Sequence, residues 1–517
     1  MSKLCCRAFL TALALMAVAA QAGMPPEETI KSMKVAEGLE VMLFASEPEI
    51  VNPVSMDIDA KGRVWIVEGA NYRGARNVRP EGDRIVILED TNGDGKAESV
   101  KVFAQDPKIF CPLGICVLGN KVYVAQSPNM MVWTIDASGD KPAGPPEVMF
   151  SGFSGVNHDH GLHAGMFGPD GRFYFNSGND GLSGGNFDKV GPEVGATAEI
   201  KNSKGELLVD STGSHPFPKG KIWRGKPKAG NGYKQGMAFR CNLDGTEFET
   251  LGHNFRNNFE AAVDSFGTVW QSDNDDDGNQ GVRLNYVMEG GDFGYANWGG
   301  NVSRYPTQSA QEAHFNQRMP GTVPNLYNTG GGSPTGITVY EGSLLPAKYH
   351  GAVLHTNSGG QWYGYLGAFM NTPNGAGYNC VLDELITAKD NFFKPDDVCV
   401  APDGAVFVSD WYDGQSGGHG LTDKTPGKQQ GRVYRLAPAG NKPAAVKLDL
   451  DTVPGQIAAI TNPNNAVRYL AYQKLVSGGA PAEAALKELY KSSTNLRHRA
   501  RALWILARSA DGKTIVQ

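Results

Sequence analysis

The chain has 517 residues, a formal net charge of −6, 66 glycines and 30 prolines. The slight negative charge provides no basic patch for a nucleic acid, which argues against that class of partner. The high glycine content indicates many short strands joined by tight turns, so we expect a mainly β protein with a large core.

Residues 1–22 have the pattern of a secretory signal peptide. Lys3 and Arg7 precede and flank an apolar run over residues 8–20, and small residues surround a cleavage site near Ala22. The apolar run is short for a membrane-spanning helix. We therefore expect a periplasmic or secreted protein. An uncleaved N-terminal anchor is the alternative, and it is the one route to membrane association that the sequence offers.

One pattern recurs six times: an apolar segment, a turn rich in Asp, Gly or Asn, and a run of β-formers. Such units are typical of β-hairpins, and their radial repetition protects the sheet edges. We predict a six-bladed β-propeller over residues 36–437, with a β-sandwich or two stacked β-domains as the alternative. The long insertion at 182–236 is expected to be an extended surface excursion near one face, with a lid as one role. The six copies cover residues 53–67, 112–124, 162–175, 259–270, 334–355 and 397–408.

A histidine-rich segment stands just before the third hairpin, where His158, Asp159, His160 and His163 fall within six residues. An imidazole at a strand end suits a general base, and Asp159 could orient it. Three histidines could also bind a metal, although the spacing lacks the helical repeat of specific zinc motifs. A third interpretation is that some of them satisfy buried polar groups in the propeller channel.

The hexapeptide 253–258, His-Asn-Phe-Arg-Asn-Asn, precedes the fourth hairpin in the same way. Arg256 can hold a carboxylate or phosphate with a two-pronged guanidinium, and Asn257 adds an orienting amide. We expect ligand binding here. The alternative is that Arg256 pairs with an acidic residue of a neighbouring blade.

Two acidic turns resemble the start of a calcium loop, in which alternate oxygen atoms point at one ion. Neither turn has glutamate at the twelfth position, and a solvated turn would have the same composition. The candidate ligands are Asp273, Asp275 and Asp277 in one turn and Asp90, Asn92 and Asp94 in the other.

The segment Ser409-Asp-Trp-Tyr-Asp413 follows the sixth hairpin. Trp411 could stack on a planar cofactor or a sugar, and Arg432 could meet its acidic groups. Packing within the last blade is the alternative for both side chains.

Five cysteines follow residue 22: Cys111, Cys116, Cys241, Cys380 and Cys399. In an oxidising compartment we expect one or two disulfides, with Cys111–Cys116 and Cys380–Cys399 as the candidate pairs. The chain contains no CxxCH motif, so it carries no c-type haem attachment site of its own.

The pattern changes beyond residue 437. Residues 438–452 are rich in Pro, Ala and Lys and are expected to form a linker. From residue 453 to 517 the apolar residues follow helical spacing. Paired helices of this length predict HEAT-like repeats. Because about three or more repeats are needed to bury a continuous core, the array is expected to be incomplete.

Together these residues resemble the soluble glucose/sorbosone dehydrogenase superfamily, whose six-bladed propellers bind pyrroloquinoline quinone (PQQ) and calcium. The similarity lies in His160 eight residues before Gly168-Pro-Asp, in Arg256-Asn257 before a hairpin, and in Gln271-Ser-Asp273. The resemblance implies that His160 takes the substrate's hydroxyl proton and that Arg256 and Asn257 contact the quinone. Gln271 then belongs to the cofactor-binding residues, and the segment after it supplies calcium ligands. His158 and His163 would be supporting groups.

The whole chain is more closely similar to large secreted proteins described as membrane-bound dehydrogenases. In those proteins such a propeller is joined to HEAT repeats and a c-type haem domain. The motifs at 253–258, 272–278, 334–336 and 409–413 carry this similarity. Three features differ: the haem motif is absent, the calcium segment is more acidic than in glucose dehydrogenases, and three histidines stand where the sugar enzymes typically show one.

The function expected from the sequence is that of an exported quinoprotein-like dehydrogenase, an oxidoreductase for a sugar or alcohol hydroxyl. Its electrons would pass to an external acceptor such as a cytochrome c. The alternative is a non-catalytic propeller that binds carbohydrate or a protein. A metal-dependent hydrolase or lyase is the third hypothesis.

Overall fold

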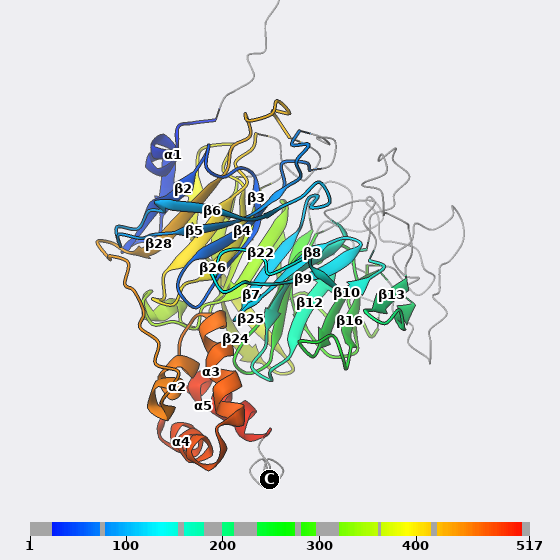
Figure 1. Cartoon of the computed structure of the whole chain (residues 1–517), viewed down its shortest axis with the longest axis vertical. Coiled ribbons are helices and arrows are strands. Elements are labelled where there is room, and N and C mark those ends of the chain that lie inside the picture. Colours follow the sequence, from blue (N-terminus) through cyan, green and yellow to red (C-terminus); the bar gives the residue numbers. More distant parts are fainter. Residues whose placement is uncertain are drawn as a thin grey trace, which may run out of the picture.

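The computed structural model describes residues 23–72, 78–153, 160–179, 199–210, 235–274, 281–295, 320–359, 363–414 and 421–508. Within these ranges the strands form six separate sheets, arranged as the blades of a β-propeller (Figure 1). The fold is therefore mainly β, with five short α-helices, four of them near the C-terminus. This confirms the predicted fold class.

Each blade begins with a hairpin at the centre of the propeller, and all six predicted hairpins occupy this position. Blade 1 consists of β3 (Pro53–Ile58), β4 (Val64–Glu68), β5 (Arg84–Glu89) and β6 (Ser99–Gln105), and blade 2 consists of β7 (Gly114–Leu118), β8 (Lys121–Gln126), β9 (Asn129–Thr134), β10 (Glu147–Ser151), β13 (Glu199–Asn202) and β14 (Leu207–Asp210). Blade 3 consists of β11 (Leu162–Phe167), β12 (Phe173–Ser177), β15 (Gly236–Cys241), β16 (Glu249–Phe255) and β20 (Gly291–Asp292), and blade 4 consists of β17 (Ala261–Val263), β18 (Val269–Asp273), β19 (Val282–Val287) and β21 (Tyr327–Gly330). Blade 5 consists of β22 (Pro334–Val339), β23 (Val353–Asn357), β24 (Tyr365–Asn374), β25 (Gly377–Ala388) and β1 (Met33–Val35), and blade 6 consists of β26 (Pro395–Val400), β27 (Val406–Asp410), β28 (Arg432–Pro438) and β2 (Leu39–Ser46).

The N-terminal strands close the ring. β2 pairs with β28 in blade 6, and β1 pairs with β25 in blade 5, so the start of the chain completes the two blades formed last. The short helix α1 (Pro26–Ser32) precedes these strands. Closure of this kind covers edge groups that would otherwise remain unpaired.

The same side-chain arrangement stabilises the inner hairpin turn of two blades. In blade 1, Asp59 Oδ1 accepts the backbone N–H groups two and four residues further on, and Oδ2 accepts the indole N–H of Trp65. Asp264 and Trp270 repeat this arrangement in blade 4. Asp is favoured here because its carboxylate replaces the backbone acceptors that a tight turn lacks.

Apolar and aromatic side chains fill the spaces between blades. Phe150 of blade 2 packs against Phe175 of blade 3 with ring centroids 5.6 Å apart, and Phe175 packs against Phe239 at 5.2 Å. All three rings are buried. Burial of aromatic rings on this scale is a main source of stability in such interfaces.

Part of the long insertion differs from the prediction. Instead of a surface excursion, residues 199–210 form the hairpin β13–β14, which pairs with β10 and extends blade 2 at its outer edge. Unpaired backbone groups on β10 favour the addition of further strands, although the sequence shows only weak alternation there. Most of the remaining insertion lies outside the described residues, as do residues 1–22.

Four helices follow the propeller: α2 (Val453–Ile460), α3 (Asn465–Ser477), α4 (Gly479–Ser492) and α5 (Leu496–Leu506). Figure 1 shows them in orange and red at one end of the sheets. Asn464 donates to the carbonyl groups of Ile58 and Val400, and Trp504 donates to the carbonyl of Ser265. This helical segment therefore lies against the end of the propeller where the inner strands finish. Its HEAT-like character remains a prediction.

The predicted disulfides are not present. In the described part of the chain, no disulfide is formed by Cys111, Cys116, Cys241, Cys380 or Cys399. Cys380 belongs to an outer strand of blade 5, whereas Cys399 lies on the inner strand of blade 6, so the blade order separates them. Cys111 and Cys116 are each buried at their own positions around β7, and spacing along the sequence did not bring their sulfur atoms together.

None of the helices in the described residues has the length and apolar character that a membrane span requires.

Candidate functional site

The candidate site lies at the end of the propeller opposite the helical segment. His160 stands two residues before β11, whereas the turn that follows β11 receives a hydrogen bond from Tyr472 of α3 to the carbonyl of Asp170. The inner strand β11 therefore separates the two ends. His160 is 6% exposed, so it lies at the base of the loops and not on an open surface.

His160 is oriented by an amide that follows the next strand. Its Nδ1 lies 2.7 Å from Asn179 Oδ1. The backbone N–H of Asn179 in turn donates to the carbonyl of Arg256 at 2.7 Å. A Cβ on Gly178 would lie 2.7 Å from the His160 carbonyl oxygen and 2.3 Å from Asn257 Oδ1, so glycine is needed for the close approach. These contacts join the histidine segment to the 253–258 segment.

Asp273 connects the third predicted group to the same place. Its Oδ1 accepts the backbone N–H groups of Arg256 and Asn257 at 3.0 and 2.8 Å. Its Oδ2 forms an ion pair with Arg283 at 2.7 Å, and both side chains are fully buried. Burial raises the pKa of Asp273 although Arg283 opposes the shift. Both oxygen atoms are thus engaged by the protein, and the observed role of Asp273 is to hold the Arg256–Asn257 backbone.

Four amide side chains lie fully buried between blades 3 and 4, namely Asn176, Asn258, Gln271 and Asn285. The amide nitrogens of Asn176 and Asn258 both lie 3.4 Å from Gln271 Oε1. Among the described residues, Gln271 Nε2 and both polar atoms of the Asn285 amide have no hydrogen-bond partner. Unsatisfied buried amides are rare because each costs free energy, so this cluster marks a place for a polar ligand or for water.

The ring of His163 is held by contacts with neighbouring residues of the protein. Its Nδ1 lies 2.8 Å from the carbonyl oxygen of Asn258, and its ring packs on Phe259 with centroids 4.5 Å apart. The side chain is fully buried. It therefore braces the segment that carries Arg256 and Asn257.

The described geometry brings His160, Arg256, Asn257, Gln271 and Asp273 together at one end of blades 3 and 4. A family described as "Domain of unknown function (DUF7133)" matches residues 25–221 and 211–440, which together span all six blades. The chain belongs to this family.

Solved structures with similar folds include three sugar dehydrogenases. The holo PQQ domain of pyranose dehydrogenase from Coprinopsis cinerea is 13% identical and aligns over 78% of this chain and 97% of its own, with a TM-score of 0.50. The PQQ-bound aldose sugar dehydrogenase from Streptomyces coelicolor is 16% identical over 78% and 98%, with a TM-score of 0.46. The apo aldose sugar dehydrogenase from Escherichia coli is 13% identical over 77% and 99%, also with 0.46. At these identities the first of them supports the propeller fold of the DUF7133 chain. No curated protein matches it.

Four of the predicted site residues lie outside the described part of the DUF7133 chain. They are His158, Asp159, Asp275 and Asp277.

The second acidic turn of the DUF7133 propeller lies away from this site, in the β5–β6 connection of blade 1. Asp90, Asp94 and Glu98 have oxygen atoms within 4.8 Å of one another, and Asp90 is partly buried. Asp90 also accepts the backbone N–H groups of Gly93 and Gly95. The Asn92 amide donates to Asp94 at 3.3 Å. Hydrogen bonds within the turn therefore account for this composition, and its calcium binding stays a prediction.

Trp411 and Arg432 both contact other parts of the protein. Trp411 directly follows β27 and packs edge-on against Tyr72 of blade 1 at 5.2 Å. Arg432 is fully buried, pairs with Glu47 at 2.8 Å and donates to the hydroxyl of Thr29 and the carbonyl of Met24. Its donors therefore anchor the N-terminal segment, which corrects the prediction that Arg432 meets cofactor acids. The packing alternative therefore describes Arg432, whereas the stacking role of Trp411 stays a prediction.

Sequence analysis of this DUF7133 member missed Asn179, Asn176, Asn258 and Asn285. Asn179 orients His160, and the orienting role expected for Asp159 stays a prediction because Asp159 lies outside the described residues. The available signal was the position of Asn179. It stands two residues after the end of β12, and the ends of neighbouring antiparallel strands lie together. Amides, however, have no charge pattern that would distinguish them from ordinary turn residues.

Proposed function

We propose that this protein is an exported dehydrogenase that oxidises a hydroxyl group of a sugar or another alcohol at the His160 site. The observation that carries the proposal is the contact between His160 Nδ1 and Asn179 Oδ1. An amide oxygen only accepts hydrogen bonds, so Nδ1 keeps its proton and Nε2 holds the lone pair. A neutral imidazole held in this tautomer is suited to take the proton of a substrate hydroxyl.

The carbon next to that hydroxyl must lose a hydride, and no protein side chain accepts one. The resemblance of the sequence points to PQQ as the group that supplies this acceptor when bound. The residues present fit a polar ligand of that kind, because Gln271 and Asn285 have unsatisfied buried polar atoms beside the Arg256–Asn257 segment. Arg256 and Asn257 would hold the cofactor, and Asp273 keeps their backbone in position.

Calcium fits the described residues less well. Asp273 was predicted as a ligand, but its two oxygen atoms accept backbone N–H groups and pair with Arg283. No step of the proposed reaction is therefore assigned to calcium. A hydride and the hydroxyl proton leave the substrate in each turnover, which amounts to two electrons and two protons. We propose a cytochrome c as the external electron acceptor, so that two molecules of it would take one electron each while both protons pass to the solvent. Export is proposed from the signal-like residues 1–22.

The test is dye reduction by the purified protein supplied with PQQ, with and without calcium, over a panel of sugars and alcohols. His160→Ala is expected to lower turnover by about 10²-fold or more, because the proton acceptor is lost, while binding of the quinone remains. Cofactor binding is followed by its absorbance. Failure of the wild-type protein to bind the quinone under these conditions would sink the proposal.

The same experiment separates the alternatives. Turnover that depends on His160 supports the dehydrogenase. Sugar binding without turnover in either protein, measured by calorimetry, would instead support a carbohydrate-binding propeller.

A further inference from the structure

A second cleft lies at the opposite end of the molecule, between the propeller and the helical segment. It has a volume of about 530 Å³, within the usual size of small-molecule sites. Its walls come from three places: the 341–351 connection of blade 5, the 402–404 turn of blade 6, and the α2–α3 and α4–α5 connections. It shares none of its lining residues with the His160 site.

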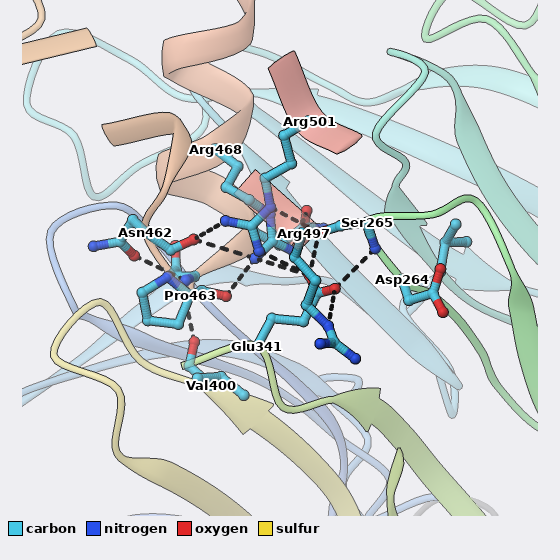
Figure 2. A network of polar contacts seen from close by, with 12 residues as sticks. Asp264, Ser265, Glu341, Val400, Asn462, Pro463, Arg468, Arg497 and Arg501 are labelled. Carbon is cyan, nitrogen blue, oxygen red and sulfur yellow. Dashed lines mark hydrogen bonds and ion pairs between the residues drawn. The ribbon is translucent and has the colours of Figure 1, made fainter. Parts of the chain in front are cut away.

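Glu341 at the back of this cleft is surrounded by three arginines of the helical segment. Figure 2 shows Arg468, Arg497 and Arg501 converging on it, with nitrogen to oxygen distances of 3.9, 3.2 and 2.8 Å respectively. Burial raises the pKa of Glu341, but the charges of Arg501 and Arg468 and the hydrogen bonds from Ser265 outweigh it, so the pKa falls to about 2. One carboxylate therefore faces three guanidinium groups.

Arg468 and Arg501 are otherwise satisfied by backbone carbonyl groups. Arg501 Nη1 donates to Ile460 at 3.0 Å, and Arg468 Nη1 donates to Pro463 at 2.5 Å. Their side chains have only 14% and 2% exposure. Both arginines thus serve the packing of the helices on the propeller.

Arg497 differs from the other two. Its Nε lies towards Glu341, but its two terminal nitrogen atoms form no hydrogen bond with any described residue, and its side chain is 27% exposed. Its guanidinium carbon lies 5.3 Å from the ring centre of Phe266. A Cβ on Gly351 would lie 1.9 Å from Arg497 Nη2, so a glycine at φ +85° leaves the space that the guanidinium fills. The group is thus held in place, and both terminal nitrogen atoms are left available by the part of the chain that the structure describes.

The remaining walls are polar. Ser343, His350, Thr461, Asn495 and His498 line the cleft. Burial and the nearby Arg501 lower the pKa of His498 to about 4, so its ring is neutral at neutral pH and can both donate and accept.

The acidic lining residues are already paired. Glu341 faces the three arginines, and Asp403 pairs with Arg435 at 2.9 Å. Among the described residues of the cleft, the three arginines therefore carry more positive charge than the single Glu341 carboxylate balances.

We propose that this cleft binds a small organic anion whose carboxylate or phosphate group pairs with Arg497 and whose hydroxyl groups meet the polar walls. A planar guanidinium with two available N–H groups matches either oxyanion. The ligand would touch both the propeller and the helical segment. It therefore stabilises their packing, because a ligand that binds the folded state alone shifts the unfolding equilibrium.

The experiment is a thermal unfolding and calorimetric titration of the full chain with gluconate, inorganic phosphate and glucose 6-phosphate at up to about 10 mM. At least one anion is expected to raise the melting temperature, and neutral glucose is not. Arg497→Gln should weaken binding by about tenfold or more, because two charge-assisted hydrogen bonds are lost. Comparison of the Kd for gluconate with the Kd for inorganic phosphate identifies whether the cleft prefers a carboxylate or a phosphate.

Two further variants make the outcome decisive. Arg499→Gln, on the same helix and with its guanidinium over Tyr490, is the matched control and should bind as the wild type does. Ser343→Glu changes an exposed residue of the wall, leaves all three arginines in place and should abolish binding by charge repulsion, even where Arg497→Gln proves unstable. Equal binding by all four proteins, or no binding of any anion by the wild type, overturns the proposal.

Discussion

At the scale of single residues, Asn179 has the most specific role near the proposed reaction. It accepts from His160 Nδ1 through its side chain and donates to Arg256 through its backbone. It therefore orients the base and ties it to the segment that carries Arg256. Asn179 is a positioning residue, since it acts through the imidazole.

Two substitutions of Asn179 distinguish its role in orienting the His160 ring from the effect of a charge placed beside that ring. Asn179→Ala is expected to lower kcat/KM by about 10²-fold, because the tautomer of His160 is no longer held. Asn179→Asp keeps an acceptor and adds a negative charge, which raises the pKa of His160. The base must be deprotonated to act, so the acidic limb of the kcat/KM profile should move to higher pH. The measurement is kcat/KM against pH, with thermal unfolding of each variant as the control; an unmoved limb in Asn179→Asp contradicts this role.

At the scale of elements, Asn464 shows how the helical segment is attached. Its Oδ1 accepts from Val467 N–H and so caps the N-terminus of α3. Its Nδ2 donates to the carbonyls of Ile58 and Val400, at the ends of β3 and β26. One buried side chain thus begins a helix and joins it to two blades.

Removal of this amide should cost more than removal of an ordinary cap. For Asn464→Ala we expect a loss of about 2–4 kcal/mol, from the cap and from two buried carbonyl groups left unsatisfied. Thr452→Ala is the matched control, because Thr452 caps α2 on the exposed side and should cost about 1 kcal/mol. Urea unfolding of both variants gives the comparison, and equal losses would show that Asn464 acts as a cap alone.

At the scale of the whole molecule, carboxyl groups on or next to the inner strands link neighbouring blades around the central channel. Asp57 accepts from Val117 N–H, and Glu260 accepts from Ile337 N–H, so each joins its blade to the next. Asp397 joins blade 6 to blade 1 in the same way, through Met56 N–H. Burial raises the pKa of all three, for Asp57 to about 7.

These raised values predict how stability depends on pH. The folded protein keeps protons that the unfolded chain releases above about pH 4. The contribution of these protonated carboxyl groups to the free energy of unfolding is therefore complete below that pH. It is lost as the pH rises through the pKa values of the folded protein. Glu260→Gln keeps the acceptor for Ile337 N–H and removes one such proton, so the slope of unfolding free energy against pH should flatten by up to about 1.4 kcal/mol per unit.

The measurement is urea unfolding at about pH 5, 7 and 9, which brackets the shifted range. Glu37→Gln, at an exposed position outside the channel, is the control and should leave the slope unchanged. A wild-type stability that rises from the lowest to the highest of these pH values contradicts the argument.

The fold was predictable from the sequence because its signals are local. The inner hairpin of each blade combines alternating apolar residues with a turn whose chemistry is visible in the chain, as in Asp59-Ala-Lys-Gly62. The helical spacing after residue 453 is equally local. The insertion at 182–236 was the exception, since β13 and β14 form only where the edge of blade 2 offers partners.

The candidate site was predictable in part. His160, Arg256 and Asp273 were singled out by residue type and by position before a hairpin or after a strand, and the structure brings them together. The partner of each was decided by the tertiary structure. Arg283 lies ten residues from Asp273 but opposite it on the next strand, and Glu47 reaches Arg432 across the closure of the ring.

The sequence by itself therefore determined the hairpin at the centre of each blade, the number of blades and the residue types near the site. These features depend on turn residues and on apolar periodicity, and both are contained in short stretches of the chain. The tertiary structure decided which polar groups meet, because ring closure and the docking of the helical segment bring together residues that lie far apart in the sequence. Ring closure pairs Thr29 with Arg432, 403 positions apart, and the docked helices pair Glu341 with Arg501, 160 positions apart. Whether a buried charge serves a ligand or an ion pair depends on those partners, and sequence spacing carries no record of them.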